Sequence, residues 1–287
     1  MPERGLVEIS KSFFVDPDYR EAMGRLGLTS IDAIFSFNAA KNLAKKNLAR
    51  HRSRLQFALE SSSAQSTTVF LKRYDGPPVL SQLRNWLAAR SRRSCAGLEV
   101  AAATELAAAG IEVPRVISFG EQWGLLFERR SFIVTKEISD AEAIERKLPG
   151  CFNGSPTREN LKLRRNFIAR LARFIERFHR TSYRHRDLYF SHIFCDHEGR
   201  FFLIDLARAF KPAVLNRRFQ VKDLAQVYYS APGRYFSKTD RLRFYMGYAG
   251  RSKLTPEDKA MIRRVIHKAG QMARHAKRHG GGVPFTD

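Results

Sequence analysis

The chain has 287 residues, of which 44% are hydrophobic, so it can form one large domain or two small ones and is not wholly disordered. Its formal net charge of +23 favours polyanionic partners such as anionic lipid headgroups or nucleic acid. The sequence has no run of about 18 apolar residues and no secretory signal, and its cysteines lack metal-ligand spacing. We therefore expect a cytoplasmic protein that contacts a membrane only peripherally.

The first part of the chain is expected to be rich in strands. The apolar stretch 31–40 is predicted to form a strand. The basic run 41–54 is interpreted as a solvated, charged strand pair, and the alternative is a phosphate-facing loop or the rim of an anionic substrate site. The basic run contains no glycine, so it is not a glycine-rich phosphate loop. Clusters of apolar residues between turn residues predict further strands at 68–74, 115–119, 124–127 and 132–138.

A helix rich in Ala and Leu is predicted at 80–109, with an interruption near 94–97. Glu99 lies on its apolar face, so its carboxylate points inward and needs a cation. We expect Lys72, near the end of a strand, to be that cation. Glu105 is the alternative, but it falls on a different and solvated face of the helix.

The composition changes at residue 139, where we place the domain boundary. A basic amphipathic helix at 161–181 leads into His185-Arg186-Asp187, and an apolar run then ends on Asp205. The next helix, at 216–229, contains Asp223, and we expect the backbone of the His185–Arg186 turn to donate hydrogen bonds to its carboxylate. A last helix is predicted to begin at Thr255-Pro256-Glu257-Asp258.

The two acids, Asp187 on a loop and Asp205 at a strand end 18 residues later, form the pattern that places a base beside a metal ligand in kinase-like lobes. Asp187 is predicted to accept the proton of the attacking hydroxyl, and Asp205 to hold Mg²⁺ on the phosphates of ATP. His192 takes the position at which protein kinases have a metal-binding asparagine, so it is a second candidate metal ligand, although imidazole binds Mg²⁺ less well than oxygen ligands do.

The nucleotide is expected to be bound by the first part of the chain. Lys72, paired with Glu99, is predicted to hold the phosphates that are not transferred. The adenine ring is predicted to dock on the backbone of the segment that contains Thr135, Glu137 and Ile138.

Six motifs together make the sequence resemble the lipopolysaccharide core kinases, the heptose and Kdo kinases, over residues 30–230. They are Phe70-Leu71-Lys72-Arg73, Leu98-Glu99-Val100, Gly110-Ile111-Glu112-Val113-Pro114, the stretch His185 to His192, Leu203-Ile204-Asp205-Leu206-Ala207-Arg208-Ala209 and Lys222-Asp223-Leu224-Ala225.

The resemblance implies an α+β, bilobal protein kinase-like fold, with a small β-rich, nucleotide-binding N-lobe (1–138) and a larger, mainly α-helical catalytic C-lobe (139–287). It implies transfer of the γ-phosphate of ATP, with Mg²⁺, to a heptose or Kdo hydroxyl. The implied partners are an anionic glycolipid and the inner-membrane surface, with no nucleic acid.

Other readings of the sequence remain open. The chain could be a kinase-like protein acting on another anionic acceptor, or a non-catalytic pseudokinase, although Lys72, Glu99, Asp187 and Asp205 are all present. It could be a metallohydrolase using His185, Asp187 and His192. It could also bind nucleic acid, which would explain the charge but not the paired acids, since these repel phosphate unless a metal intervenes.

Overall fold

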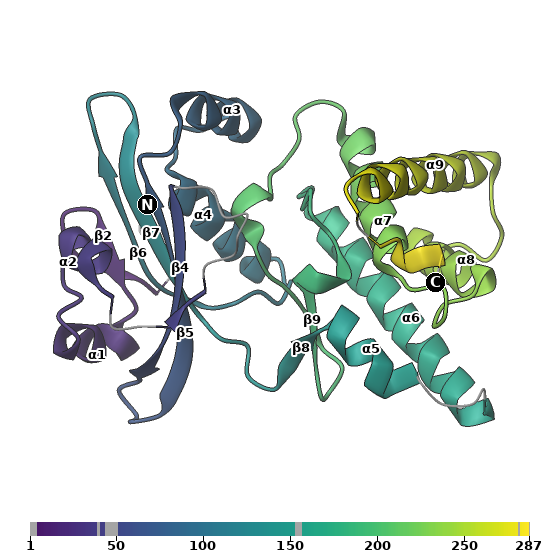
Figure 1. Ribbon diagram of the computed structural model, residues 1–287, viewed down its shortest axis with the longest axis horizontal. Coiled ribbons are helices and arrows are strands. Elements are labelled where there is room, and N and C mark those ends of the chain that lie inside the picture. Colours follow the sequence, from purple (N-terminus) through teal and green to yellow (C-terminus); the bar gives the residue numbers. More distant parts are fainter. Residues whose placement is uncertain (1–4, 39–40, 44–50, 153–156, 281, 287) are drawn as a thin grey trace. The chain divides into compact units, whose positions relative to one another are not determined.

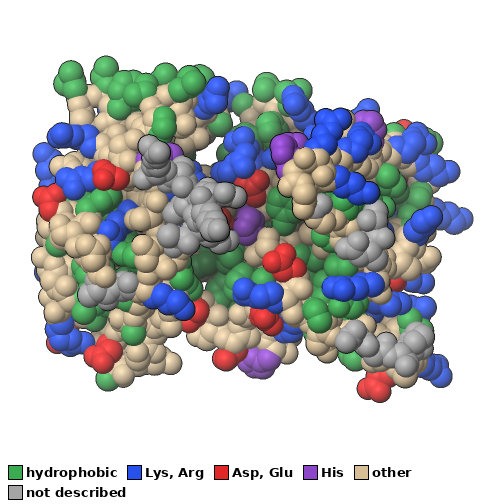
Figure 2. Space-filling view, viewed as in Figure 1, with side chains coloured by type: hydrophobic (Ala, Val, Ile, Leu, Met, Phe, Trp, Pro, Cys, Tyr) green, Lys and Arg blue, Asp and Glu red, His purple; other side chains and the backbone are tan. Residues whose placement is uncertain are grey.

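The computed structural model describes residues 5–38, 41–43, 51–152, 157–280 and 282–286 (Figure 1). The chain divides into two compact units. Unit 1 comprises residues 1–108 and 113–138, and unit 2 comprises residues 109–112 and 139–287. Lys and Arg side chains are spread over the visible face of each unit (Figure 2).

Unit 1 is built on an antiparallel sheet whose described strands follow the order β1-β2-β6-β7-β5-β4-β3. The strands are β1 (Val7–Ser10), β2 (Phe13–Val15), β3 (Lys41–Asn42), β4 (Arg52–Glu60), β5 (Ser66–Asp75), β6 (Val116–Trp123) and β7 (Glu128–Lys136). The helical elements are η1 (Pro17–Tyr19), α1 (Arg20–Arg25), α2 (Ile31–Ser36), α3 (Val79–Ala89) and α4 (Cys95–Ala108). The strands predicted at 68–74 and 132–138 therefore correspond to β5 and β7.

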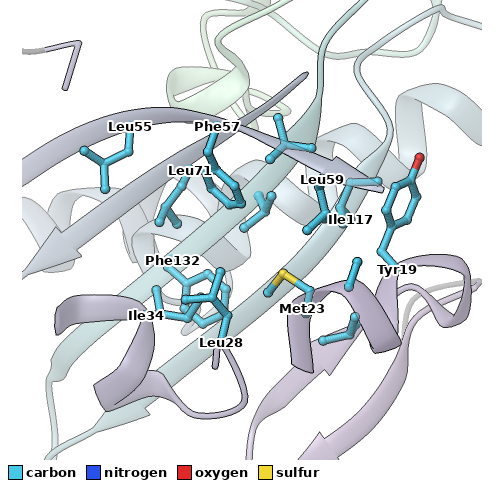
Figure 3. Close-up of a cluster of buried hydrophobic side chains, with 14 of the residues drawn as sticks. Tyr19, Met23, Leu28, Ile34, Leu55, Phe57, Leu59, Leu71, Ile117 and Phe132 are labelled. Carbon is cyan, nitrogen blue, oxygen red and sulfur yellow. The ribbon is translucent and has the colours of Figure 1, made fainter. Parts of the chain in front are cut away.

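The two faces of this sheet bury different sets of side chains. On one face, Met23 and Ile34 from the first helices pack against Phe57, Leu71 and Phe132 of the strands (Figure 3). On the other face, α4 places Ala96 and Val100 against Tyr74 and Ile133. Because side chains alternate along a strand, Leu71 faces the first cluster, whereas Lys72 and Tyr74 both face α4 on the other side of the sheet.

Two predictions for unit 1 are wrong. Residues 31–36 form helix α2 rather than a strand: Ser30 caps the helix by accepting a hydrogen bond from the Ala33 N–H at 3.1 Å, and the buried Ile34 faces the sheet. Residues 124–127 form the turn after β6, which continues through Gly120 to Trp123. In the basic run, Lys41 belongs to β3, whereas Lys45 and Lys46 lie outside the described residues.

Unit 2 consists mainly of helices with a small antiparallel sheet in the order β10-β9-β8. Its elements are β8 (Ala141–Ala143), α5 (Ile144–Phe152), α6 (Arg158–Arg180), η2 (Phe190–His192), β9 (Ile193–Asp196), β10 (Phe201–Leu203), η3 (Leu206–Arg208), α7 (Asn216–Ser230), α8 (Lys238–Ala249), α9 (Pro256–Arg278) and η4 (Pro284–Thr286). Helix α6 packs on α8, and α7 packs on α9.

Local capping signals explain where the helices of unit 2 begin. The predicted start of α9 is confirmed, since Thr255 and Asp258 form a reciprocal capping box. Ser237 and Asp240 form the same motif at α8, a helix that the sequence reasoning missed. In the described part of the chain, no helix is both long and apolar enough to cross a bilayer.

Candidate functional site

In unit 1, the predicted ion pair between Lys72 and Glu99 is present. Lys72 Nζ on β5 contacts Glu99 Oε1 on α4, and the Tyr74 hydroxyl donates to Glu99 Oε2 at 3.2 Å. The Lys72 and Glu99 side chains are only 14% and 5% exposed, so the pair is held in a largely dry setting. Glu105, the alternative, is exposed.

The first turn of α4 is fixed to β7, and this fixes Glu99. The Cys95 N–H donates to Glu128 Oε2 at 2.8 Å, and the Ala96 N–H donates to Ser131 Oγ at 3.1 Å. The Gly97 N–H is capped by Ser94 Oγ at 2.9 Å. These three contacts satisfy N–H groups that the start of a helix leaves without intrahelical partners. Burial raises the pKa of the Glu128 carboxyl, which accepts the first of these hydrogen bonds.

The backbone predicted to bind adenine is partly engaged within unit 1. The Lys136 N–H donates to the Arg115 carbonyl and the Glu137 N–H donates to the Thr68 carbonyl, each at 2.8 Å. Thr135 pairs with Phe70 across the sheet. A role for Thr135, Glu137 and Ile138 in nucleotide binding stays a prediction. Because the N–H groups of Lys136 and Glu137 already donate to carbonyls of unit 1, adenine would have to bind other backbone groups of this segment.

In unit 2, helix α7 holds the loop that carries Asp187. The buried Asp223 accepts hydrogen bonds from the N–H groups of His185 at 2.8 Å and Arg186 at 2.9 Å, as predicted. One turn further along α7, Gln226 accepts from the Leu188 N–H at 2.9 Å and donates to the Arg186 carbonyl at 2.7 Å. Asp187 is therefore clamped on both sides in the chain.

Ser230 extends the same face of α7 and accepts a hydrogen bond from the Phe190 N–H at 3.1 Å. Asp223, Gln226 and Ser230 are spaced i, i+3 and i+7, which places them in one row on the helix. Of these three residues, only Asp223 was predicted from the sequence. Gln226 and Ser230 could have been found as well, because they are polar residues at helical spacing from Asp223.

His192 and His185 connect the Asp187 loop to the strand end before Asp205. His192 Nδ1 lies 2.8 Å from the Asp187 carbonyl oxygen, which can only accept, so this nitrogen carries the proton. In the neutral imidazole, Nε2 then has its lone pair available, 4.0 Å from Asp205 Oδ2. Two further bonds hold Ile204, the residue before Asp205. His185 Nε2 donates to the Ile204 carbonyl at 3.0 Å, and the Ile204 N–H donates to the His192 carbonyl at 3.1 Å.

Two non-glycine residues at the site have left-handed backbone conformations. Arg186 has φ 70° and Asp205 has φ 59°. Such conformations cost about 1–3 kcal/mol each and persist where the surroundings enforce them. Asp223 and Gln226 do so at Arg186, and the His185–Ile204 bond does so next to Asp205.

Arg208 is a site residue that the sequence reasoning did not single out. Its Nη1 contacts both oxygens of the Asp187 carboxylate, at 3.1 and 2.8 Å. Arg208 is the last residue of η3, the short helix that follows Asp205, and it ends the Asp-Leu-Ala-Arg motif. Its side chain is 48% exposed, so the guanidinium can also reach an anionic ligand from solvent.

The described part of the chain contains no metal site made by protein side chains alone. Among the residues that the structure describes, no three or more His, Cys, Asp or Glu side chains gather so as to hold a metal ion. Asp205 and His192 offer one carboxylate and one imidazole nitrogen. This small donor set suits Mg²⁺ that is bound mainly through substrate phosphates and water.

Replacing Asp223 should destabilise unit 2. In Asp223→Asn, an amide NH₂ takes the place of one carboxylate oxygen and cannot accept from the His185 or Arg186 N–H. Leaving one buried donor without a partner costs about 1–3 kcal/mol, so the free energy of unfolding in urea should fall by that amount. The same change at the exposed Asp140 is the control. A fall no larger than that of Asp140→Asn would contradict the role given to Asp223.

Stability should also decrease on mild acidification. Burial lowers the pKa of His179 and of His185 below the ordinary 6.5. The unfolded chain therefore takes up protons first, so stability is greatest above about pH 6.5 and falls below it, by up to about 1.4 kcal/mol per pH unit for each imidazole. Urea unfolding between about pH 8 and pH 5.5 measures this slope. A flat profile would show that both rings can be charged in the folded state.

Comparison with known proteins gives a family and a fold. The family model described as lipopolysaccharide kinase (Kdo/WaaP) matches residues 38–248. The lipopolysaccharide core heptose(I) kinase WaaP of Escherichia coli strain K12 is 26% identical over 238 residues, covering 80% of this chain and 87% of that protein. The protein of the same name from Pseudomonas aeruginosa strain PAO1 is 26% identical over 212 residues, covering 71% and 73%.

A solved structure, WaaP in complex with acyl carrier protein, is similar with a TM-score of 0.67 and 22% sequence identity. The similarity covers 91% of this chain and 99% of that chain. The predicted protein kinase-like fold, with a β-rich first part and a helical second part, is thereby confirmed.

Proposed function

The chain belongs to the lipopolysaccharide kinase (Kdo/WaaP) family, and on this premise we propose that it transfers the γ-phosphate of ATP to a heptose hydroxyl of the lipopolysaccharide core. As a member of this family it is a phosphotransferase with an alcohol acceptor. The choice of heptose over Kdo rests on the similarity to two WaaP heptose(I) kinases. The observation that carries the proposal is the Asp187 loop, which α7 holds on both sides of the carboxylate.

The residues divide the work of phosphoryl transfer. Asp187 accepts the proton of the acceptor hydroxyl on a carboxylate oxygen, and Arg208 orients that carboxylate before the acceptor binds. Lys72, positioned by Glu99, binds phosphate oxygens of the nucleotide. Asp205 and His192 Nε2 would hold Mg²⁺, which supplies charge neutralisation to the phosphates when bound. The protein has little covalent chemistry to perform, so positioning and charge account for most of its contribution.

The acceptor is an anionic glycolipid, and the net charge of +23 favours its approach. We propose that the enzyme works on the cytoplasmic face of the inner membrane, where a protein without a spanning helix in its described part meets a lipid substrate peripherally.

An acyl carrier protein is a further proposed partner, since one solved structure of similar fold is WaaP in complex with such a protein. Unit 2 contains a pocket of about 450 Å³ that could take an acyl chain. Its lining includes Leu171, Phe244, Ile262 and Val265, with Lys238 and Arg241 among the polar lining residues. Native mass spectrometry of the chain with acylated and unacylated carrier protein tests this, because only the acylated form should bind tightly if the pocket is used.

The activity is tested by incubating the chain with Mg-ATP and lipopolysaccharide from a strain that lacks core kinases. Mass spectrometry of the released core should show one added phosphate on a heptose, and none with Asp187→Asn. Phosphate on Kdo would change the acceptor within the same family. No phosphate on any core sugar, with ATP bound normally, would overturn the proposal.

A further inference from the structure

Unit 1 exposes an unusual group of leucines on α3 and on the turn between β6 and β7. We call Leu80, Leu83, Leu87, Leu125 and Leu126 the leucine patch; their exposed fractions are 59%, 41%, 81%, 96% and 60%. Figure 2 shows hydrophobic side chains gathered along the edge of unit 1 at the place of these two segments. Contiguous exposed apolar surface of this kind marks a contact site for a protein or a membrane.

Helix α3 turns its apolar side away from the protein. Leu83 and Leu87 are one turn apart on an exposed face, whereas the polar Gln82 is buried. Gln82 Nε2 donates to the Pro77 carbonyl at 2.8 Å, and Gln82 Oε1 accepts from the Glu128 N–H at 2.8 Å. The polar side chain of Gln82 thus anchors the helix to β7, and the leucines of the helix stay exposed on its surface.

Aromatic and arginine side chains join α3 to the turn. The Trp86 ring stacks on Phe127 at 5.6 Å and lies 6.2 Å from Trp123. The Arg92 guanidinium lies over the Trp123 ring at 4.8 Å and donates to the Leu126 carbonyl at 2.7 Å. The two leucine-bearing segments therefore form one surface.

The surroundings of the leucine patch are positively charged. Residues 79–94 contain four arginines and no acidic residue. All four are exposed, and so is a fifth arginine that follows the turn; the five are Arg84, Arg90, Arg92, Arg93 and Arg129. Leucines beside tryptophans and arginines match the layers of a bilayer surface, where acyl chains lie below amphipathic rings and anionic headgroups.

We propose that the leucine patch inserts into the headgroup–acyl boundary of an anionic bilayer and holds unit 1 at the membrane surface. The proposal rests on the proposed function in one respect, that the acceptor is a glycolipid located in that bilayer. Charge complementarity favours a bilayer as the occupant. Helix α9 is also basic, but it buries Met261 and Val265 against the protein, so it offers the bilayer charge with little apolar surface.

Vesicle binding tests the proposal without ATP or acceptor. The chain's two tryptophans, Trp86 and Trp123, both adjoin the leucine patch, so their fluorescence reports on this site alone. The full chain should sediment with vesicles of phosphatidylcholine and phosphatidylglycerol, at least about tenfold more tightly than with phosphatidylcholine alone at low salt. Its emission should shift to shorter wavelength on binding and be quenched by brominated lipid.

The double variant Leu83→Gln/Leu87→Gln should bind the anionic vesicles at least about tenfold more weakly. Leu163→Gln, at a leucine of α6 that is 54% exposed, should bind as the unaltered chain does. Equal binding by the double variant, no blue shift, or no vesicle binding would overturn the proposal. So would a dimer in solution that the double variant dissociates, since the leucine patch would then join two copies.

The double variant should keep its phosphotransfer activity on a detergent-solubilised acceptor. A chain that binds vesicles through the leucine patch but phosphorylates no core sugar would contradict the proposed function alone. A chain that phosphorylates the solubilised acceptor but ignores vesicles would contradict the membrane proposal alone.

Discussion

Asp187→Asn is expected to lower kcat by a factor of about 10²–10⁴ while leaving Mg-ATP binding close to that of the unaltered chain. The substitution keeps the size of the side chain and the bonds that Asp223 and Gln226 make to the neighbouring backbone. It removes the carboxylate that we propose accepts the proton of the attacking hydroxyl. Phosphate transfer and ATP binding should be measured separately, by mass spectrometry of the core and by calorimetry.

Arg208→Gln separates the chemical role of Asp187 from its ion pair. If Asp187 served only as a partner for Arg208, both variants would lose the same activity. An exposed pair contributes about 0–1 kcal/mol, so Arg208→Gln should lose no more than about tenfold if Asp187 is the base. Full transfer activity in Asp187→Asn would remove Asp187 from the mechanism and leave the metal ligand and the cation to account for catalysis.

Short-range patterns in the sequence predicted several contacts of the candidate site and one helix start. Alternation along β5 placed Lys72 opposite the core side chain Leu71, and helical spacing turned Glu99 inward, so the ion pair followed from two local periods. Asp223 was predicted for a similar reason: a carboxylate on an apolar helix face requires donors, and the nearest motif offered backbone N–H groups. The capping residues before α9 fixed its start without reference to the rest of the fold.

The errors arose where a short segment has two readings. Six apolar-rich residues at 31–36 satisfy either period, and the Ser30 cap together with burial of Ile34 decided for a helix. The run 124–127 is apolar but exposed at Leu125 and Leu126, so hydrophobicity alone misassigned a turn as a strand. In both segments the environment, which a local pattern does not contain, determined the outcome.

Contacts between side chains of distant segments were not predictable. The Arg208–Asp187 pair depends on the path of η3 after a left-handed Asp205, and no residue type in the motif dictates that path. The outward leucines of α3 contradict the usual expectation that apolar faces turn inward. That contradiction is informative, because sequence rules fail most often where a surface has a function of its own.

Asp205→Asn is expected to lower the rate of transfer by a factor of about 10²–10³ and to raise the Mg²⁺ concentration needed for half-maximal activity. The reason is the proposed donor set: Asp205 would supply the charged oxygen ligand, and His192 Nε2 would be a weaker ligand for Mg²⁺. The backbone should tolerate the change, since asparagine adopts the left-handed conformation found at φ 59° more readily than most residues do.

The Mg²⁺ dependence distinguishes this effect from a general loss of structure. Activity at increasing Mg²⁺ should recover in part in Asp205→Asn, whereas in Asp187→Asn it should stay low at every concentration, because a missing base is not replaced by more metal. His192→Ala should show a smaller shift in the same direction, since it removes the weaker of the two proposed ligands and also the bond to the Asp187 carbonyl. If Asp205→Asn kept the Mg²⁺ requirement of the unaltered chain, Asp205 would not be the metal ligand. The lower rate would then have to come from a changed conformation of the segment between β10 and η3.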